Sequence, residues 1–160
     1  MNLIRQIARL FCGHEKEPKP QIGRFAMPMS DLQREYADLG IKKLYGSLDP
    51  EYYYTNLQGW GKVFGWIYFN CELPKYSVSS NGKWNLDCED FAIWLKAMIS
   101  LHFGLNCFAI TIGDMPRGRH GFNMLRAEDG HYCWEPNPGF NIEAPFAIGE
   151  HGYQPLYNFV

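Results

Sequence analysis

The chain has 160 residues, of which 46% are hydrophobic and 16% aromatic, and its formal net charge is −2. This composition excludes an intrinsically disordered chain and suffices for the core of one domain. The small negative charge gives no electrostatic basis for binding nucleic acid, and no apolar run reaches the roughly 18 residues of a membrane span. We therefore expect a folded protein with no nucleic-acid partner and no transmembrane segment.

The first 25 residues are expected to form an arm and a linker. Five apolar side chains near the N-terminus would share one face of a helix, which we expect to dock on its own domain or on a partner: Leu3, Ile4, Ile7, Leu10 and Phe11. Arg5, Gln6 and Arg9 interrupt this apolar run, so it lacks the continuous core of a secretory signal. We expect a cytoplasmic protein, with association to a virion as the alternative location. Residues 13–25 are charged and contain prolines, which is typical of a linker.

The domain is predicted to span residues 26–160 and to begin with helices. A short helix is expected from Ser30, its N-cap, to Leu39, just before Gly40. The aromatic stretch that follows is expected to contain a buried helix, and residues 76–86 a polar loop.

The clearest helix begins after Asp87, which fits an N-cap. Asp90, three residues later, fits the reciprocal partner of a capping box, and Gly104 fits the C-terminal stop. Between them the apolar residues keep helical spacing.

Strands are predicted after this helix. The first reads CFAITIG, and a hairpin follows in GRHGFNMLRAEDGHYCWEPN, with its turn near Asp129 and Gly130. One long helix followed by at least three strands indicates an α+β fold. The Gly- and Pro-containing tail is expected to pack irregularly over the sheet.

The chain contains five cysteines, an odd number with wide spacing, which argues against a disulfide framework. Cys88 would occupy the first turn of the long helix, where unpaired backbone N–H groups and the helix dipole favour a thiolate and so a nucleophile. Three acidic neighbours act against this by raising the pKa of the thiol: Asp87, Glu89 and Asp90. His120, on the hairpin, is the candidate base.

A third group is needed to orient the imidazole of His120. A four-residue hairpin turn would pair Arg126 with His131. His120 then falls opposite Asn137, with Glu135 one diagonal away. A tighter turn shifts the register by two residues. Side-chain alternation still keeps Glu135 and Asn137 on the face of the hairpin that carries His120. Either residue could orient the imidazole, and the hairpin register decides between them.

The string LDCEDFAIWLKAMI resembles the D-C-[DE]-D-[FY]-A signature of transglutaminase-like cysteine proteinases of bacteria and phages. The string HGFN resembles the strand that carries the catalytic histidine in that family. The string WEPNPG resembles the strand that ends in the family's third catalytic residue, which is followed by Pro. The resemblance runs from Trp84 to Gly139. It implies a papain-like α+β fold, with the nucleophile at the N-terminus of a central helix packed on a small antiparallel sheet.

The resemblance also implies roles for individual residues. Cys88 would be the nucleophile and His120 the general base and acid. Glu135 would orient the imidazole in place of the family's usual Asp, whereas Asn137 would give a papain-type Cys-His-Asn arrangement. The oxyanion hole would use the backbone N–H of Cys88 and a side-chain donor from the preceding loop, for which the candidates are Asn81, Trp84 and Asn85.

No cofactor is expected, with one exception. A calcium-dependent branch of the family binds the ion through acidic residues that flank the cysteine, and Asp87 and Glu89 match those positions.

Two functions follow from these observations. The first is a cysteine-dependent amide hydrolase or acyl-transferase, acting through a thioester intermediate on a protein or peptide substrate. The alternative is a catalytically silent binding protein of the same fold, such as a phage component or a factor that binds a host protein. A thiol that alkylates fast at neutral pH would favour the enzyme.

Overall fold

The fold is described from a computed structural model, and the description covers residues 17–46, 49–71 and 87–160. The predicted amphipathic arm and the predicted loop at residues 76–86 therefore lie outside the described residues.

Three α-helices, eight strands and two short 3₁₀ turns are described. In chain order they are β1 (Phe25–Pro28), α2 (Met29–Asp38), β2 (Lys43–Tyr45), β3 (Glu51–Tyr54), α3 (Leu57–Asn70), α4 (Cys88–Phe103), β4 (Phe108–Met115), β5 (Gly118–Ala127), β6 (Gly130–Trp134), η1 (Pro138–Phe140), β7 (Phe146–Ala147), η2 (Glu150–Gly152) and β8 (Gln154–Phe159).

The helices agree with the sequence except at their ends. The first predicted helix is α2, which begins one residue before Ser30, with Pro28 as the N-cap. The buried helix predicted in the aromatic stretch is α3, capped by the Asn56 side chain, which accepts a hydrogen bond from the Gly59 backbone N–H at 2.8 Å. No helix among residues 17–46, 49–71 and 87–160 is long and apolar enough to cross a membrane.

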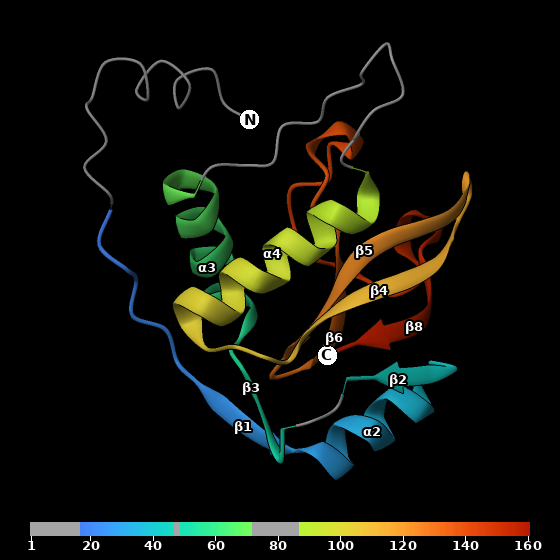
Figure 1. The fold of residues 1–160 in the computed structure, drawn as a ribbon, viewed down its shortest axis with the longest axis horizontal. Helices are drawn as coiled ribbons and strands as arrows, with labels where there is room; N and C mark the ends of the chain where they lie inside the picture. The colour runs from blue at the N-terminus through green and yellow to red at the C-terminus, as the bar shows by residue number, and fades with distance from the viewer. Residues whose placement is uncertain (1–16, 47–48, 72–86) are drawn as a thin grey trace.

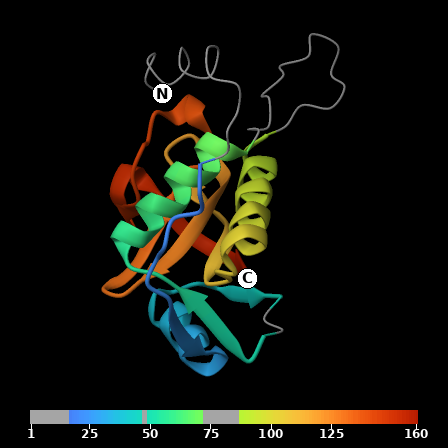
Figure 2. The same cartoon turned by 90° about the vertical axis from the view of Figure 1, so that its left-hand side faces the viewer.

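Most strands join one six-stranded sheet in the order β2-β8-β4-β5-β6-β7, and β1 and β3 form a separate antiparallel pair. The large sheet is antiparallel except at one edge, where β2 runs parallel to β8. Helices α3 and α4 lie side by side over one face of this sheet (Figures 1 and 2). Helix α2 packs with β1 and β3 at the other side of the central strands, in a cluster that includes Leu32, Tyr36, Ala109 and Met124.

The predicted small antiparallel sheet is therefore wrong in both size and pairing. The expected strand and hairpin correspond to β4, β5 and β6, but β8 comes from the tail that was expected to be irregular, and β2 adds a parallel pair. Lys43 is aligned with Tyr157, more than a hundred residues later in the chain. Such a pairing leaves no local pattern in a strand of three residues.

The hairpin register is that of the four-residue turn. Arg126 is aligned with His131, and the ladder continues to Asn123 and Trp134, where β6 ends. Glu135 and Asn137 lie beyond the ladder, so the expected placement of Asn137 opposite His120 does not occur.

The described part of the predicted linker is residues 17–25, of which Phe25 begins β1. Residues 17–24 lie between α3 and α4 (Figure 2). The backbone carbonyl of Glu17 accepts a hydrogen bond from the Trp66 indole at 2.9 Å, and that of Gly23 accepts one from the Thr55 hydroxyl at 2.6 Å. Ile22 packs against the main core cluster.

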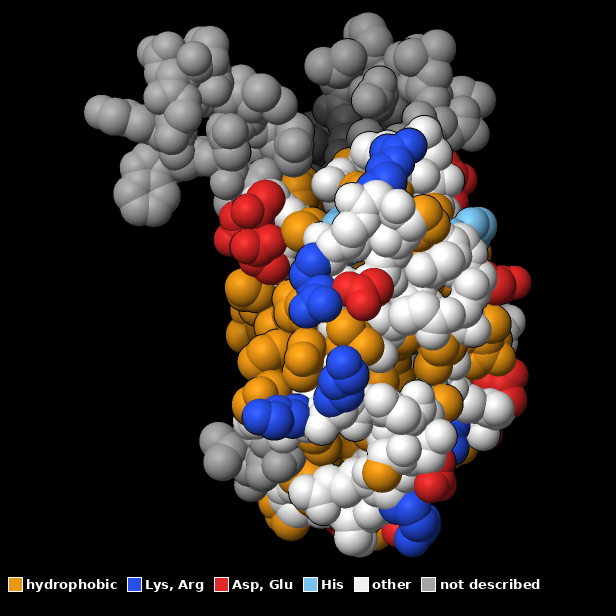
Figure 3. All heavy atoms as spheres, turned by 90° about the vertical axis from the view of Figure 1, so that its right-hand side faces the viewer, with side chains coloured by type: hydrophobic (Ala, Val, Ile, Leu, Met, Phe, Trp, Pro, Cys, Tyr) orange, Lys and Arg blue, Asp and Glu red, His pale blue; other side chains and the backbone are white. Residues whose placement is uncertain are grey.

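Figure 3 shows cationic and anionic side chains scattered among hydrophobic ones on the face that carries the outer ends of β4 and β5.

Candidate functional site

The start of α4 is built as the sequence predicts. Asp87 is the N-cap, its carboxylate accepts from the backbone N–H of Asp90, and the Asp90 carboxylate accepts from the backbone N–H of Asp87 at 3.1 Å. The helix ends at Gly104, which has a left-handed backbone with φ of 62°. The predicted capping box is confirmed, and it fixes Cys88 as the first helical residue.

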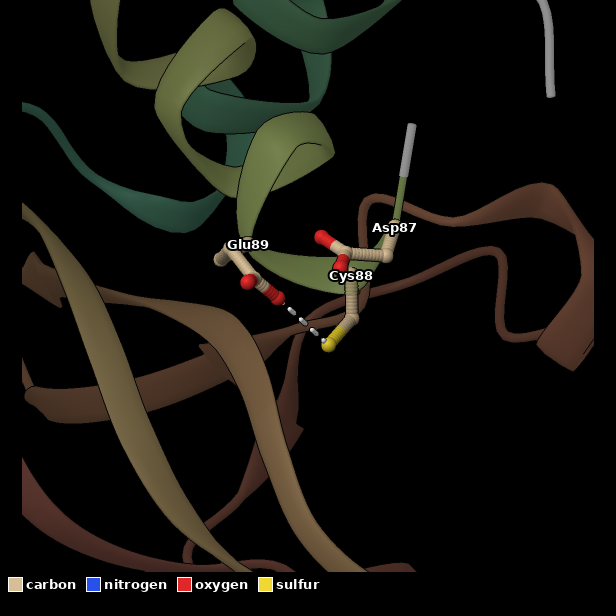
Figure 4. Close-up of side chains that lie close together, drawn as sticks. All are labelled: Asp87, Cys88 and Glu89. Carbon is tan, nitrogen blue, oxygen red and sulfur yellow. Dashed lines mark hydrogen bonds between the residues drawn. The ribbon is translucent and has the colours of Figure 1, made fainter. Parts of the chain in front are cut away.

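The thiol of Cys88 forms hydrogen bonds with Glu89 in α4 and with Gly121 in β5. It donates a hydrogen bond to the Glu89 carboxylate at 3.2 Å, as Figure 4 shows. It accepts one from the backbone N–H of Gly121 on β5 at 3.3 Å. Partial burial of Cys88, together with the carboxylates of Glu89 and Asp87, raises the pKa of the thiol, and the Gly121 contact offsets only part of this.

Burial is the largest cause of this increase in pKa. The carboxylate of Glu89 adds to it, because it accepts from the S–H group and repels a thiolate.

His120 lies in a buried network centred on Glu135. The Nε2 atom of His120 is 2.6 Å from the carboxylate of Glu135. Glu135 is only 2% exposed. The same carboxylate accepts from the Tyr153 hydroxyl at 2.8 Å and from the backbone N–H of Asn137 at 2.8 Å. Burial and the nearby Glu135 raise the pKa of Tyr153, so this hydroxyl stays a donor.

Neighbouring residues of β5 point to opposite faces of the sheet. Asn123 faces α4, because its amide donates to the Ala92 carbonyl at 3.0 Å. Alternation places Gly121 on that same side and puts His120 with Phe122 on the other, where their rings stack with centroids 6.3 Å apart. Among the residues that the structure describes, no hydrogen bond joins Cys88 to His120.

The remaining predicted site residues have other positions. Asn137 caps η1, where its side chain accepts from the Gly139 backbone N–H at 2.9 Å, so its side chain serves a turn. The oxyanion candidates Asn81, Trp84 and Asn85 lie outside the described residues.

The calcium candidates lie together. Ligand atoms of Asp87, Cys88 and Glu89 all fall within 4.8 Å of one another. A hydrogen bond between the two carboxyl groups raises the pKa of Asp87 and lowers that of Glu89. The donor set of carboxylate oxygens suits a hard cation such as calcium, whereas the thiol does not. Calcium at this position stays a prediction.

A second candidate site, which we call the Tyr53 cleft, opens where β3 meets the C-terminal end of α4. It has a volume of about 360 Å³ and is lined by Arg24, Asp49, Pro50, Glu51, Tyr53, Ser100, Gly104 and Asn106. The Arg24 guanidinium lies over the Tyr53 ring at 3.9 Å and donates to the Gly104 carbonyl at 2.9 Å.

Asn106 organises the floor of the Tyr53 cleft. Its side-chain oxygen accepts from the Tyr53 backbone N–H at 2.6 Å, and its amide donates to the Asp49 carboxylate at 2.8 Å. The Tyr53 hydroxyl donates to the Glu51 carboxylate at 2.9 Å. No sequence motif marks this site, because its residues come from three distant segments of the chain.

Comparisons with known proteins bear on the fold. No family model and no curated protein matches the chain. Among solved structures it is similar to a PSL1a–E64 complex, with a TM-score of 0.59, 11% identity, and 84% of this chain and 50% of the other covered. It is also similar to Polyporus squamosus lectin bound to the human-type influenza-binding epitope Neu5Acα2-6Galβ1-4GlcNAc, with a TM-score of 0.55, 10% identity, and 84% and 49% covered. The chain thus spans about half the length of these structures.

These likenesses correct two predictions. The fold is shared with a lectin structure rather than with a transglutaminase-like proteinase, so the predicted papain-like fold is wrong. The predicted cysteine-dependent hydrolase or acyl-transferase, with its protein or peptide substrate, is corrected with it. At the residue level, the predicted contact between His120 and Glu135 is confirmed at 2.6 Å, whereas burial and the Glu89 carboxylate raise the pKa of the Cys88 thiol.

Proposed function

We propose that this chain is a binding domain without turnover and that it takes a carbohydrate ligand in the Tyr53 cleft. The proposal sharpens the binding alternative that the sequence left open. The observation that carries it is the cleft itself, in which an aromatic ring, a guanidinium, two carboxylates and a carboxamide meet. Support comes from the solved Polyporus squamosus lectin of similar fold, which is bound to the trisaccharide Neu5Acα2-6Galβ1-4GlcNAc.

The groups in the cleft match the chemistry of a sugar. Each sugar hydroxyl both donates and accepts, so it suits planar side chains that offer several hydrogen bonds in fixed directions. Arg24 has five N–H donors, of which the structure shows one bound to Gly104. The carboxylates of Asp49 and Glu51 each offer about four acceptor positions, and the internal network uses one oxygen of each.

The groups that line the cleft are held by contacts with one another, which favours binding. Asn106 ties β3 to the end of α4 through the Tyr53 backbone, and stacking on Tyr53 fixes the Arg24 side chain. A ligand therefore meets groups that are already ordered, which reduces the entropic cost of association.

Carbohydrate binding is tested by an NMR titration of the full chain with Neu5Acα2-6Galβ1-4GlcNAc and with Galβ1-4GlcNAc. We expect saturable amide shifts centred on Tyr53, Ser100 and Asn106 with at least one sugar. Glu51→Gln should weaken binding by roughly tenfold through loss of charged hydrogen bonds, whereas Glu128→Gln, on the exposed hairpin turn, should have no effect. Absence of shifts with both sugars, or shifts centred elsewhere, would overturn the proposal.

The absence of turnover is tested separately through the thiols. Cys88 should react with iodoacetamide no faster than Cys71, which is also partly exposed, and E64 should leave it unmodified at neutral pH. Mass spectrometry identifies the modified residue. Fast and selective modification of Cys88 by either compound would show an activated nucleophile and refute the claim that the domain is catalytically silent.

A further inference from the structure

Helix α4 carries an apolar stripe on its outer face, made of Ile93, Ala97 and Leu101. These positions are four residues apart, so they share one side of the helix. All three are exposed, Ile93 at 49% and Leu101 at 73%. The opposite side of the helix is fully buried through Leu95 and Ile99. A helix that is apolar on both sides is normally covered on both.

The chain before residue 17 begins beside this stripe. Lys19 bonds to the backbone carbonyl of His102, the residue after Leu101, and its ammonium lies 5.6 Å from the centroid of the Phe103 ring. Two residues earlier in the chain, the backbone carbonyl of Glu17 accepts a hydrogen bond from the Trp66 indole. Residues 1–16 are thus tethered within a short reach of Leu101.

We propose that residues 1–16 cover the α4 stripe with their apolar positions. Leu3 and Phe11, the first and last apolar positions of the segment, are eight residues apart, as are Ile93 and Leu101. Eight helical residues span about 12 Å. The five residues between Phe11 and Glu17 reach at most about 17 Å, enough to seat Phe11 beside Leu101.

Charge and tethering both favour this occupant over a separate molecule. Arg5 and Arg9 lie in the segment, and the start of α4 is acidic, with Asp87 and Glu89 both exposed. A covalent tether of this length gives an effective concentration of the order of mM, above that of a second copy in dilute solution. The proposal does not depend on the function proposed for the Tyr53 cleft.

The native Cys12 makes a cross-linking test available. In the full chain, Leu101→Cys places a second thiol on the stripe, and dilute oxidation should join it to Cys12 within one molecule. The fold should tolerate this change because Leu101 is 73% exposed. Leu39→Cys, at the end of α2 and 41% exposed, is the control and should cross-link poorly. Peptide mass spectrometry identifies each disulfide.

A second pair of variants separates docking from random encounter. Ile7→Asp, in the Leu101→Cys background, puts a charge on the apolar face and should lower the cross-link yield by about fivefold or more. Gln6→Asp, one residue away on the polar face, should leave the yield unchanged. The proposal is overturned if Ile7→Asp has no effect, if Leu39→Cys cross-links equally well, or if the product is a disulfide between two molecules or with another cysteine.

Discussion

At the scale of single residues, Gly121 fixes how closely β5 approaches the start of α4. A Cβ at this position would lie 3.0 Å from the Glu89 Cα and 3.1 Å from its backbone nitrogen. Both are backbone atoms in a capped first turn and cannot move aside cheaply. The hydrogen bond from the Gly121 N–H to the Cys88 thiol depends on the same close contact.

Gly121→Ala should therefore destabilise the fold by about 1–3 kcal/mol, the usual cost of overpacking. Urea unfolding monitored by tryptophan fluorescence measures the change. Gly61→Ala is the control, because a Cβ on Gly61 in α3 would meet nothing within 4 Å. It should stabilise the protein by about 0.5–1 kcal/mol, since alanine is the better helix former. Equal effects of the two changes would contradict the close packing described for Gly121.

The acidic residues beside Cys88 give a second prediction at this scale. Glu89→Gln removes a carboxylate that raises the pKa of the thiol, so the pH midpoint of Cys88 alkylation should fall. The same titration with calcium tests the calcium prediction. A bound cation should lower the midpoint in the wild type and have less effect in Glu89→Gln. Four superimposable curves would show that Glu89 has no electrostatic role and that calcium does not bind there.

At the scale of elements, Glu35 clamps α2 to the β5–β6 hairpin. Its carboxylate accepts from Arg126 at 2.7 Å and from His131 Nε2 at 2.7 Å. Burial acts to raise the pKa of Glu35, but these two hydrogen bonds hold it below the usual value. Burial lowers the pKa of His131 and outweighs the attraction of Glu35, because the His131 side chain is only 5% exposed.

The contribution of His131 and Glu35 to the free energy of unfolding should decrease in acid. A histidine with a lowered folded-state pKa favours the neutral form, so its contribution is present above the unfolded pKa of about 6.5 and is lost as the pH falls below it. Glu35 acts in the same direction at lower pH, since its folded pKa is also lowered.

Unfolding free energies at pH 7.5 and 5.5 check this directly. The wild type should lose up to about 1.4 kcal/mol per pH unit below the unfolded pKa of His131, and His131→Gln should lose less. An equal loss in both proteins would mean that other groups cause the acid sensitivity.

At the scale of the whole molecule, the buried amide of Asn123 joins the helical layer to the sheet. It donates to the Ala92 carbonyl in α4 and to the Ala109 carbonyl in β4, both at 3.0 Å. It is fully buried, so no water replaces these contacts. One side chain thus connects three elements of the core.

Asn123→Ala should cost about 1–3 kcal/mol, because it leaves buried carbonyl groups without this donor. Calorimetry should show a lower melting temperature with the fold retained. Thr111→Val, also in the buried sheet, removes a single hydrogen bond of 2.8 Å to Asn158 and should cost less. A smaller effect from Asn123→Ala than from Thr111→Val would contradict the central position assigned to Asn123.

The sequence by itself determined the local features of this protein. The capping box of Asp87 and Asp90, the stop at Gly104 and the hairpin turn near Asp129 and Gly130 all followed from residues a few positions apart. Caps and tight hairpins are set by backbone groups within one turn, so their residue patterns carry the information.

Only the tertiary structure decided the sheet order and the state of the candidate sites. The parallel pairing of β2 with β8 and the assembly of the Tyr53 cleft join segments far apart in the chain. At Cys88, the sequence supplied opposing effects of similar size, from the helix dipole and from the acidic neighbours. The pKa of the thiol followed from its burial and from the orientation of Glu89, which depend on how β5 packs against α4.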